Sequence, residues 1–445
     1  MTKRQKTICA TAALCLMGTA LAGVSTVAAT GEEAAYSFQE AMTPIWEGDI
    51  SYMESVLPVE NEFGGIDPIQ LLYPIEEIIE VKNATLTVTY EKGVDYTVAG
   101  GKLIISDEGS IPVMSYAEFH PVTGQKGFEA KDGGYICFSE GDYFHSRQIV
   151  VTYKHTAVYE GYIPEGKREL LPNTIEKLKT KETFDLLVFG DSISVGANSS
   201  GMIGTAPYMP NYAQLFAMQL EKAYGCKVNL INPSVGGKGI TWGLEEIENV
   251  IDSQPNVDLA VIAFGMNDGN MLSGSFSGKV NRLAGKIEKA YPDVETLAIA
   301  TMLPNPQAKN FYLNQMSFYD AMVKDCQREG LAVVDMTAVH KSLLERKQYA
   351  DMTGNNVNHP NDYLARVYAQ TLFATLQQKV EVEEDKVDFG NCLPDDNTDT
   401  IGQQQPTISF FSLLTSGCSG TAPTAIGAAT ALGVATVALK KKKDD

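Results

Sequence analysis

The feature that most constrains the fold is an alternation of short apolar runs and helix-like segments between residues 185 and 377. Continuous apolar runs of this length are typical of strands that are buried on both faces of a sheet. Strands that alternate with helices of this length predict βαβ units, a parallel sheet and helices on both of its faces. The strand-like runs cover residues 185–189, 227–231, 258–264, 296–302 and 331–335. The helix-like segments cover residues 211–224, 243–251, 278–290, 318–328 and 362–377, and Asn361 is placed to cap the last of them.

Residues 30–165 show a different pattern, in which short β-like runs are separated by glycine turns. Residues 84–90 alternate apolar and polar side chains with period two, which predicts a strand with one face on a core. The series covers residues 84–90, 96–98, 102–105 and 148–153. We therefore expect an all-β sandwich at 30–165, serving as an accessory domain to an α/β domain at 173–380.

Both ends of the chain contain candidate targeting segments. Residues 1–29 have the pattern of a signal peptide, with a basic start, an apolar stretch and the small-residue site Val27-Ala28-Ala29. Residues 381–416 are rich in acidic and polar side chains and predict a solvated linker. Residues 417–445 contain an uncharged, alanine-rich run followed by four lysines, which predicts a membrane anchor with a basic inner end. A low-complexity tail is the alternative for this segment.

The net charge limits the kind of partner we expect, and the spacing of the cysteines limits the kind of site. A formal net charge of −20 over 445 residues argues against a nucleic-acid partner, which would need a basic face. It suits an extracellular protein with a neutral substrate. Two of the seven cysteines lie in the predicted signal peptide, and the other five are widely spaced, unlike a disulfide framework or a zinc motif. We expect no metal and no cofactor, and the sequence does not indicate an oligomeric state.

A candidate nucleophile follows the first strand of the predicted parallel sheet. The run ends in Gly190-Asp191-Ser192, so Ser192 stands just past a buried strand. Ligands of open α/β sheets bind at this carboxyl edge. The alternative is that Asp191 or Ser192 only caps the following helix.

Three further motifs follow later strands of the same sheet. The second strand is followed by a glycine-rich turn over residues 236–239, where a backbone N–H can approach a ligand closely. The third ends before Asn267, whose side-chain amide can donate to a developing oxyanion. His359 precedes the last helix and is expected at the same edge. Taken singly, each motif is equally compatible with an ordinary turn.

Together, Gly-Asp-Ser, the glycine turn, Gly-x-Asn-Asp and x-x-His-Pro occur in an order that resembles the SGNH (GDSL-type) hydrolases. The resemblance covers roughly residues 184–376 and implies a flavodoxin-like three-layer αβα sandwich that acts as a serine esterase. It also implies that Ser192 is the nucleophile and His359 the general base. The backbone N–H groups of Ser192 and Gly237 and the side chain of Asn267 would form the oxyanion hole.

One position departs from the family pattern. The family usually carries Asp three residues before the histidine to orient its ring, and here that residue is Asn356. An amide can accept from a ring N–H but cannot offset the charge of an imidazolium. Asp351, a backbone carbonyl or a simple Ser–His dyad are the alternatives.

These features predict a secreted esterase, tethered to the cell surface, that removes acyl groups from a carbohydrate, and we expect the acyl group to be acetyl. A lipase, lysophospholipase or thioesterase of the same family is one alternative. A catalytically weak glycan-binding surface protein that retains the fold is the other, and Asn356 is the feature that favours it.

Overall fold

The computed structural model describes residues 36–122, 124, 127–326 and 330–377. Its centre is a five-stranded parallel sheet in the order β12-β11-β10-β8-β9. The strands are β8 (Thr183–Gly190), β9 (Lys227–Ile231), β10 (Leu259–Ala263), β11 (Glu295–Ala300) and β12 (Ala332–Asp335). Numbered along the chain this is the order 2-1-3-4-5 of flavodoxin-like folds, with the crevice for ligands at the carboxyl ends of β8 and β10. The predicted three-layer α/β fold is confirmed.

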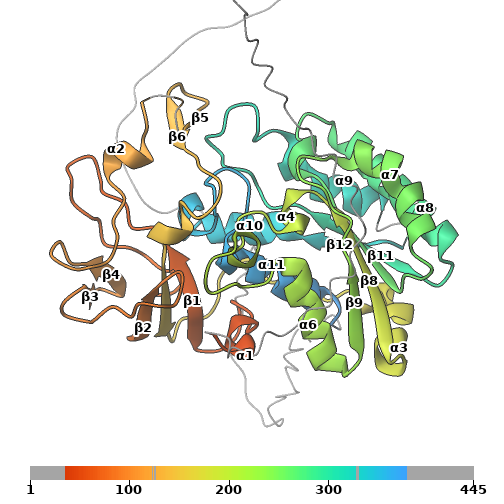
Figure 1. Ribbon diagram of the computed structural model, residues 1–445, viewed down its shortest axis with the longest axis horizontal. Helices are drawn as coiled ribbons and strands as arrows, with labels where there is room; N and C mark the ends of the chain where they lie inside the picture. Colours follow the sequence, from red (N-terminus) through yellow and green to blue (C-terminus); the bar gives the residue numbers. More distant parts are fainter. Residues whose placement is uncertain (1–35, 123, 125–126, 327–329, 378–445) are drawn as a thin grey trace, which may run out of the picture. The chain divides into compact units, whose positions relative to one another are not determined.

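Helices cover both faces of this sheet (Figure 1). They are α3 (Pro172–Thr180), α4 (Ser192–Val195), α5 (Ser200–Ile203), α6 (Tyr212–Tyr224), α7 (Ile240–Ser253), α8 (Ser273–Ala290), α9 (Phe318–Asp325), α10 (Met336–Leu344) and α11 (Asp362–Thr375). Successive side chains of a strand point to opposite faces. In β8, Leu186 and Val188 therefore pack in the core with α6 and α11, whereas Leu187 and Phe189 pack in the core with α7, α8 and α9.

The N-terminal region of the described chain is built mainly from three small antiparallel sheets. They are β1-β7-β2 (Ile50–Val56, Ile149–Lys154, Glu77–Asn83), β3-β4 (Tyr96–Ala99, Lys102–Ile105) and β5-β6 (Gly127–Glu129, Tyr135–Cys137). The short helix α1 (Phe38–Ala41) precedes β1, and the short helix α2 (Tyr116–Phe119) lies between β4 and β5 in the chain. The predicted strands at 96–98, 102–105 and 148–153 correspond to β3, β4 and β7. The expected all-β character of this region is compatible with these sheets.

The predicted strand at 84–90 is wrong. The chain turns there, directly after β2, and Leu86 has φ of 59°. The side chain of Asn83 accepts hydrogen bonds from the backbone N–H groups of Thr87 and Val88, at 2.9 and 3.0 Å. An asparagine side chain that satisfies nearby N–H groups offers the backbone a local alternative to a strand.

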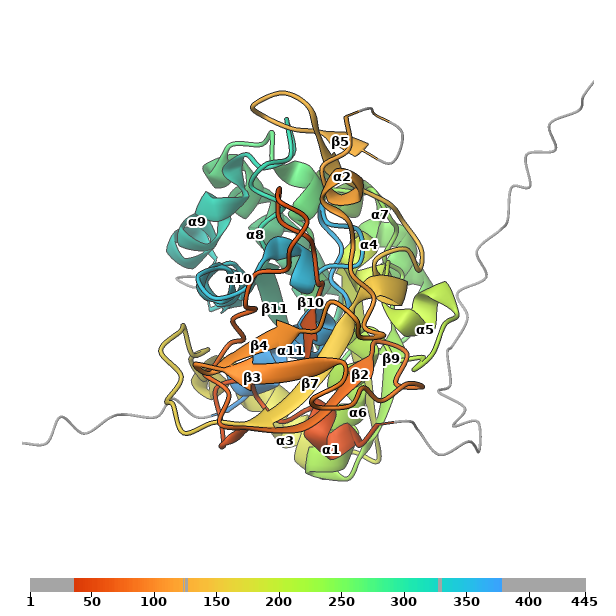
Figure 2. The same cartoon turned by 90° about the vertical axis from the view of Figure 1, so that its left-hand side faces the viewer.

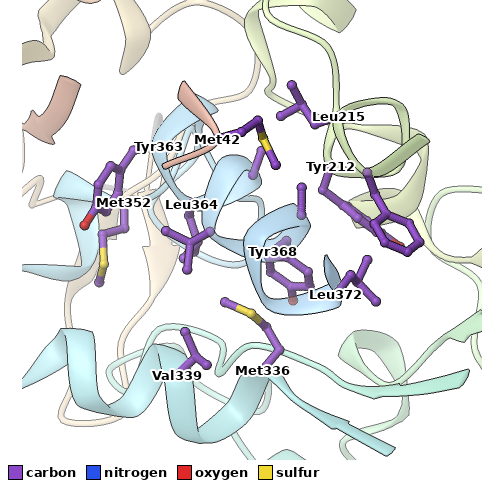
Figure 3. Packing of buried hydrophobic residues seen from close by; sticks show 14 of the residues in the cluster. Met42, Tyr212, Leu215, Met336, Val339, Met352, Tyr363, Leu364, Tyr368 and Leu372 are labelled. Atoms are coloured by element: carbon purple, nitrogen blue, oxygen red, sulfur yellow. The ribbon is translucent and has the colours of Figure 1, made fainter. Parts of the chain in front are cut away.

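Helix α11 joins the N-terminal region to the parallel sheet. Leu364, Tyr368 and Leu372 pack with residues of α6 and α10 (Figure 3). The other side of the helix carries Arg366, whose guanidinium donates to the carbonyl oxygens of Tyr52 and Met53 in β1, at 3.1 and 2.7 Å. Figure 2 shows the N-terminal strands on this side of α11. The predicted cap is also confirmed, because the Asn361 side chain accepts from the N–H of Leu364.

One hydrophobic core contains residues from both regions, including Val81 and Val151 of the N-terminal sheet and Val188 and Val261 of the parallel sheet. All described residues belong to one compact unit that ends at Val382. The predicted domain boundaries near 165 and 173 stay predictions. The signal peptide, the acidic linker and the C-terminal anchor lie outside the described residues. Within the described part of the chain, no helix is both long enough and apolar enough to cross a bilayer.

A buried ion pair also links the two regions. Nζ of Lys347, which follows α10, lies 2.6 Å from Oε1 of Glu54 in β1, and both side chains are fully buried. Glu54 also accepts from the N–H of Leu72 at 2.8 Å and from the hydroxyl of Tyr153 at 2.7 Å. These two donors are neutral, so Lys347 is the cation that balances the charge of the buried carboxylate.

We predict that Lys347→Met lowers the free energy of unfolding by about 3–5 kcal/mol, because it leaves Glu54 buried and charged without its partner. Denaturant unfolding followed by circular dichroism measures this change. Lys309→Met is the matched control, because Lys309 forms an exposed pair with Glu129 at 2.8 Å and should change little. Equal effects of the two substitutions would contradict the prediction.

Candidate active site

Ser192 lies at the tip of a tight turn between β8 and α4. Gly190 ends the strand, and a Cβ at that position would collide with the carbonyl oxygen of Ala263 in β10. Asp191 caps α4, because its Oδ1 accepts from the N–H of Ile193 at 3.0 Å. Burial raises the pKa of the Asp191 carboxyl to about 7. The capping interpretation therefore holds for Asp191, while the hydroxyl of Ser192 is directed elsewhere.

The hydroxyl of Ser192 faces His359. Nε2 of the His359 ring lies 2.9 Å from Oγ of Ser192, and both residues are largely buried. His359 stands at the end of a loop that folds back on itself, since the N–H of Gly354 donates to the His359 carbonyl at 3.0 Å. The side chain of Asn355 accepts from three backbone N–H groups of this loop, including that of His359 at 3.1 Å. The histidine is therefore held on a preorganised turn.

The other ring nitrogen of His359 has a well-defined acceptor. Oδ1 of Asn198 lies 2.7 Å from Nδ1 of the ring. The Asn198 amide nitrogen donates to the carbonyl oxygens of Gly141 and Gly354, at 3.2 and 3.3 Å, which fixes the orientation of the amide. The Asn355 amide nitrogen also lies 3.0 Å from Nδ1, but its two hydrogens are donated to Glu140 and Asn358. Because the Asn198 oxygen can only accept, we assign the hydrogen to Nδ1, so the lone pair of Nε2 faces the Ser192 hydroxyl.

An acidic side chain lies on the same side of the ring. Oε2 of Glu140 lies 3.2 Å from Nδ1 of His359, and the Glu140 side chain is about half exposed. Oε1 of Glu140 accepts from the side-chain amide of Asn355 at 3.1 Å. Burial raises the pKa of Glu140, but its hydrogen bonds and the charge of His359 outweigh this effect and hold the pKa below its ordinary value.

The glycine turn after β9 lies beside Ser192. A Cβ on Gly236 would stand 3.7 Å from Cβ of Ser192, and the next residue, Gly237, has φ of +73°, a region that favours glycine. The side chain of Asn267 donates to the carbonyl of Lys238 at 3.0 Å and so joins this turn to the end of β10. The residues that the sequence singled out for an oxyanion hole thus lie on neighbouring segments at one edge of the sheet.

The chain matches a known family over this part of its length. Residues 188–367 match the model of the GDSL-like lipase/acylhydrolase family, and this range includes Ser192, Gly237, Asn267 and His359. This range is a GDSL-like lipase/acylhydrolase domain. A search of curated protein sequences gives no significant match.

Solved structures with low sequence identity also resemble the chain. A two-domain esterase active on acetylated mannans, crystallised with mannopentaose, is 19% identical over 48% of this chain and 54% of its own, with a TM-score of 0.39. Axe2, an acetylxylan esterase from Geobacillus stearothermophilus, is 14% identical over 45% of this chain and 97% of its own, with a TM-score of 0.37. The matched part therefore spans about half of the two-domain esterase.

Neither residue that the sequence offered for orienting the ring is placed to do so. The Asn356 amide nitrogen donates to the carbonyl of Cys137 at 3.0 Å, and its oxygen accepts from Asn305. Asp351 is buried and accepts from the N–H groups of Leu57 and Gln348, at 2.8 and 2.9 Å. In the GDSL-like domain both residues hold the loop that carries His359, because their polar atoms face the backbone and neighbouring loops.

The N-terminal region also forms hydrogen bonds with the loop that carries His359. The side chain of Gln148 donates to the carbonyl oxygens of Ala350 and Thr353, at 2.8 and 2.9 Å. The Asn361 amide donates to the hydroxyl of Ser55 at 3.0 Å. The position of His359 therefore depends on contacts from both regions of the chain.

Sequence reasoning missed Glu140, Asn198 and Asn355. Asn198 follows Ser192 by six residues and has φ of 65°, a conformation that asparagine tolerates better than most residues. Asn355 directly precedes Asn356, the position where the family pattern has an aspartate. Glu140 offered no local signal, because it lies 219 positions from His359 in the chain and reaches the ring only through folding.

Among the described residues, no group of three metal-ligating side chains is suited to a metal ion.

We predict that Asn356→Asp lowers stability and does not raise activity. The new carboxylate would face the carbonyl of Cys137 without the hydrogen that Asn356 now donates, at a cost of about 1–3 kcal/mol. Thermal unfolding and ester hydrolysis measure the two effects. Asn310→Asp is the matched control, because Asn310 has φ of 59° and is exposed. A more active, equally stable Asn356→Asp protein would contradict this prediction, because it would show that the side chain at position 356 contacts the His359 ring.

Proposed function

We propose that this protein is a serine esterase that hydrolyses acyl esters, with Ser192 as nucleophile and His359 as general base. The observation that carries the proposal is the 2.9 Å approach of His359 Nε2 to Ser192 Oγ at the carboxyl edge of the parallel sheet. A serine hydroxyl is a weak nucleophile unless an adjacent base takes its proton. The match of residues 188–367 to acylhydrolases supports the same chemistry.

In this mechanism Oγ of Ser192 attacks the carbonyl carbon of the ester while its proton passes to Nε2 of His359. The tetrahedral oxyanion binds in a hole formed by the backbone N–H groups of Ser192 and Gly237 and the Asn267 side chain. An amide nitrogen has two hydrogens, so Asn267 can donate to Lys238 and to the oxyanion together. His359 then protonates the leaving alcohol, and water hydrolyses the acyl-enzyme by the same steps.

We propose an acetylated glycan as the substrate. A small acyl group suits a nucleophile that is 8% exposed in the turn between β8 and α4. A neutral polysaccharide also suits a chain with a net charge of −20, because no charge attraction is then needed for binding. Asn356 no longer favours the binding-only alternative, since other polar groups contact Nδ1 of His359.

We predict that Ser192→Ala lowers the rate of p-nitrophenyl acetate hydrolysis by at least a hundred-fold, because removing a covalent nucleophile costs orders of magnitude. Release of acetate from acetylated xylan and mannan should fall in parallel. Ser275→Ala, an exposed serine of α8, is the control and should behave as wild type. A rate within ten-fold of wild type for Ser192→Ala would contradict its role, and activity on long-chain lipid esters alone would contradict the glycan substrate.

We also propose that the protein is secreted and held at the cell surface by residues 417–445. This rests on the signal-like pattern of residues 1–29 and on the uncharged run that precedes Lys440.

A chain ending after Thr400 should therefore keep full esterase activity and lose membrane association, because every residue assigned to catalysis precedes Val382. Detergent phase separation of the full-length and shortened proteins measures this. Partition of both forms into the aqueous phase would contradict the anchor.

A further inference from the structure

We propose that Glu140, a residue of the N-terminal region, supplies the negative charge to His359 that the family pattern places three residues before the histidine. In this arrangement Asn198 orients the ring and Glu140 stabilises its charged form. The task of one aspartate is thus divided between an amide and a carboxylate from different parts of the chain. The proposal rests on the proposed esterase function.

The distances to Nδ1 of His359 distinguish the residue that orients the ring from the residue that stabilises its charge. Asn198 Oδ1 lies 2.7 Å from Nδ1 of His359, whereas Glu140 Oε2 lies 3.2 Å from the same atom. The shorter contact takes the ring hydrogen, and the carboxylate stands beside it. An amide has no net charge, so Asn198 cannot offset the imidazolium that forms when His359 takes the serine proton. The adjacent carboxylate can.

Hydrogen bonds from neighbouring loops fix the position of Glu140. The side chain of Asn355 donates to Oε1 of Glu140 at 3.1 Å, and the carbonyl of the following residue, Gly141, accepts from Asn198 at 3.2 Å. The carbonyl of Cys137 accepts from Asn356 at 3.0 Å. The segment that carries Glu140 is therefore joined to the loop of His359 at Cys137 and Glu140, and to Asn198 at Gly141. Its lowered pKa keeps the carboxyl ionised at neutral pH.

Other charged groups near this site point elsewhere. Asp191 faces the N–H of Ile193, and Asp362 accepts from the N–H of Ser200 at 2.8 Å. Asp142 is exposed beside the segment of Glu140. Among the described residues, Glu140 is the acidic side chain within ion-pair distance of His359, and the two groups are oppositely charged only when the ring is protonated.

The test is Glu140→Gln, which keeps the shape and removes the charge. We expect kcat for p-nitrophenyl acetate to fall about ten-fold with KM nearly unchanged, a modest loss because the carboxylate is partly exposed to solvent. The acid side of the pH–rate profile should also move to lower pH, because a ring without its anionic neighbour loses its proton more readily. Burial raises the pKa of the Asp191 carboxyl to about 7 in both proteins, so the comparison with wild type isolates Glu140.

Glu129→Gln is the matched control. Glu129 lies on β5 of the same region and pairs with Lys309 at 2.8 Å, so its loss should leave both kcat and the pH profile unchanged. A purely structural role for Glu140 would instead lower thermal stability and leave the acid side of the profile in place. Either that result or wild-type kinetics in Glu140→Gln would overturn the proposal.

A second variant tests the division of tasks. In the Glu140→Gln protein, Asn198→Asp places a carboxylate at the 2.7 Å position and should restore at least half of the lost rate. If the double variant folds with wild-type circular dichroism and stays as slow as Glu140→Gln, charge at Nδ1 is not the missing element and the proposal fails. Failure of the esterase function itself is distinguishable, because wild type would then lack Ser192-dependent turnover.

Discussion

The hydrogen bonds that hold the loop of His359 are the constraint that ties the two regions of the chain together. The ring of His359 must hold one nitrogen toward Ser192 and the other toward a polar acceptor, and small displacements would break either contact. The loop that carries it has no strand or long helix to stiffen it. Stiffness comes from hydrogen bonds: Asn355 satisfies three N–H groups inside the loop, and Gln148 and Asn361 join it to the N-terminal sheet.

This explains why the N-terminal region packs so closely on the α/β part. Helix α11 has the parallel sheet on one side and β1 on the other, and its Arg366 side chain donates to two carbonyl groups of β1. The fully buried pair of Lys347 and Glu54 sits where the chain leaves α10 for the His359 loop. A buried ion pair adds little net stability compared with an apolar contact, but it is satisfied in only one arrangement of its partners. It therefore favours one relative placement of the two regions.

The polar groups around His359 also illustrate how a catalytic acid can be replaced. A single aspartate normally accepts the ring hydrogen and offsets the ring charge. Here an amide with fixed orientation contacts Nδ1 at 2.7 Å and a half-exposed carboxylate at 3.2 Å. The two contacts come from a loop after α4 and from a loop after β6, so the arrangement requires both regions to be folded together.

The sequence by itself determined the parallel sheet, its helical layers and the candidate pair Ser192 and His359. It could do so because these features depend on local pattern: residues 186–189 are all apolar, and each motif directly follows a strand or precedes a helix. Only the tertiary structure decided which polar groups contact Nδ1 of His359. Position 356 is close to His359 in sequence, yet its amide faces Cys137, because a left-handed backbone conformation turns it away. Glu140 is far away in sequence and lies beside the ring, because long-range contacts follow from packing and leave no periodic trace in the chain.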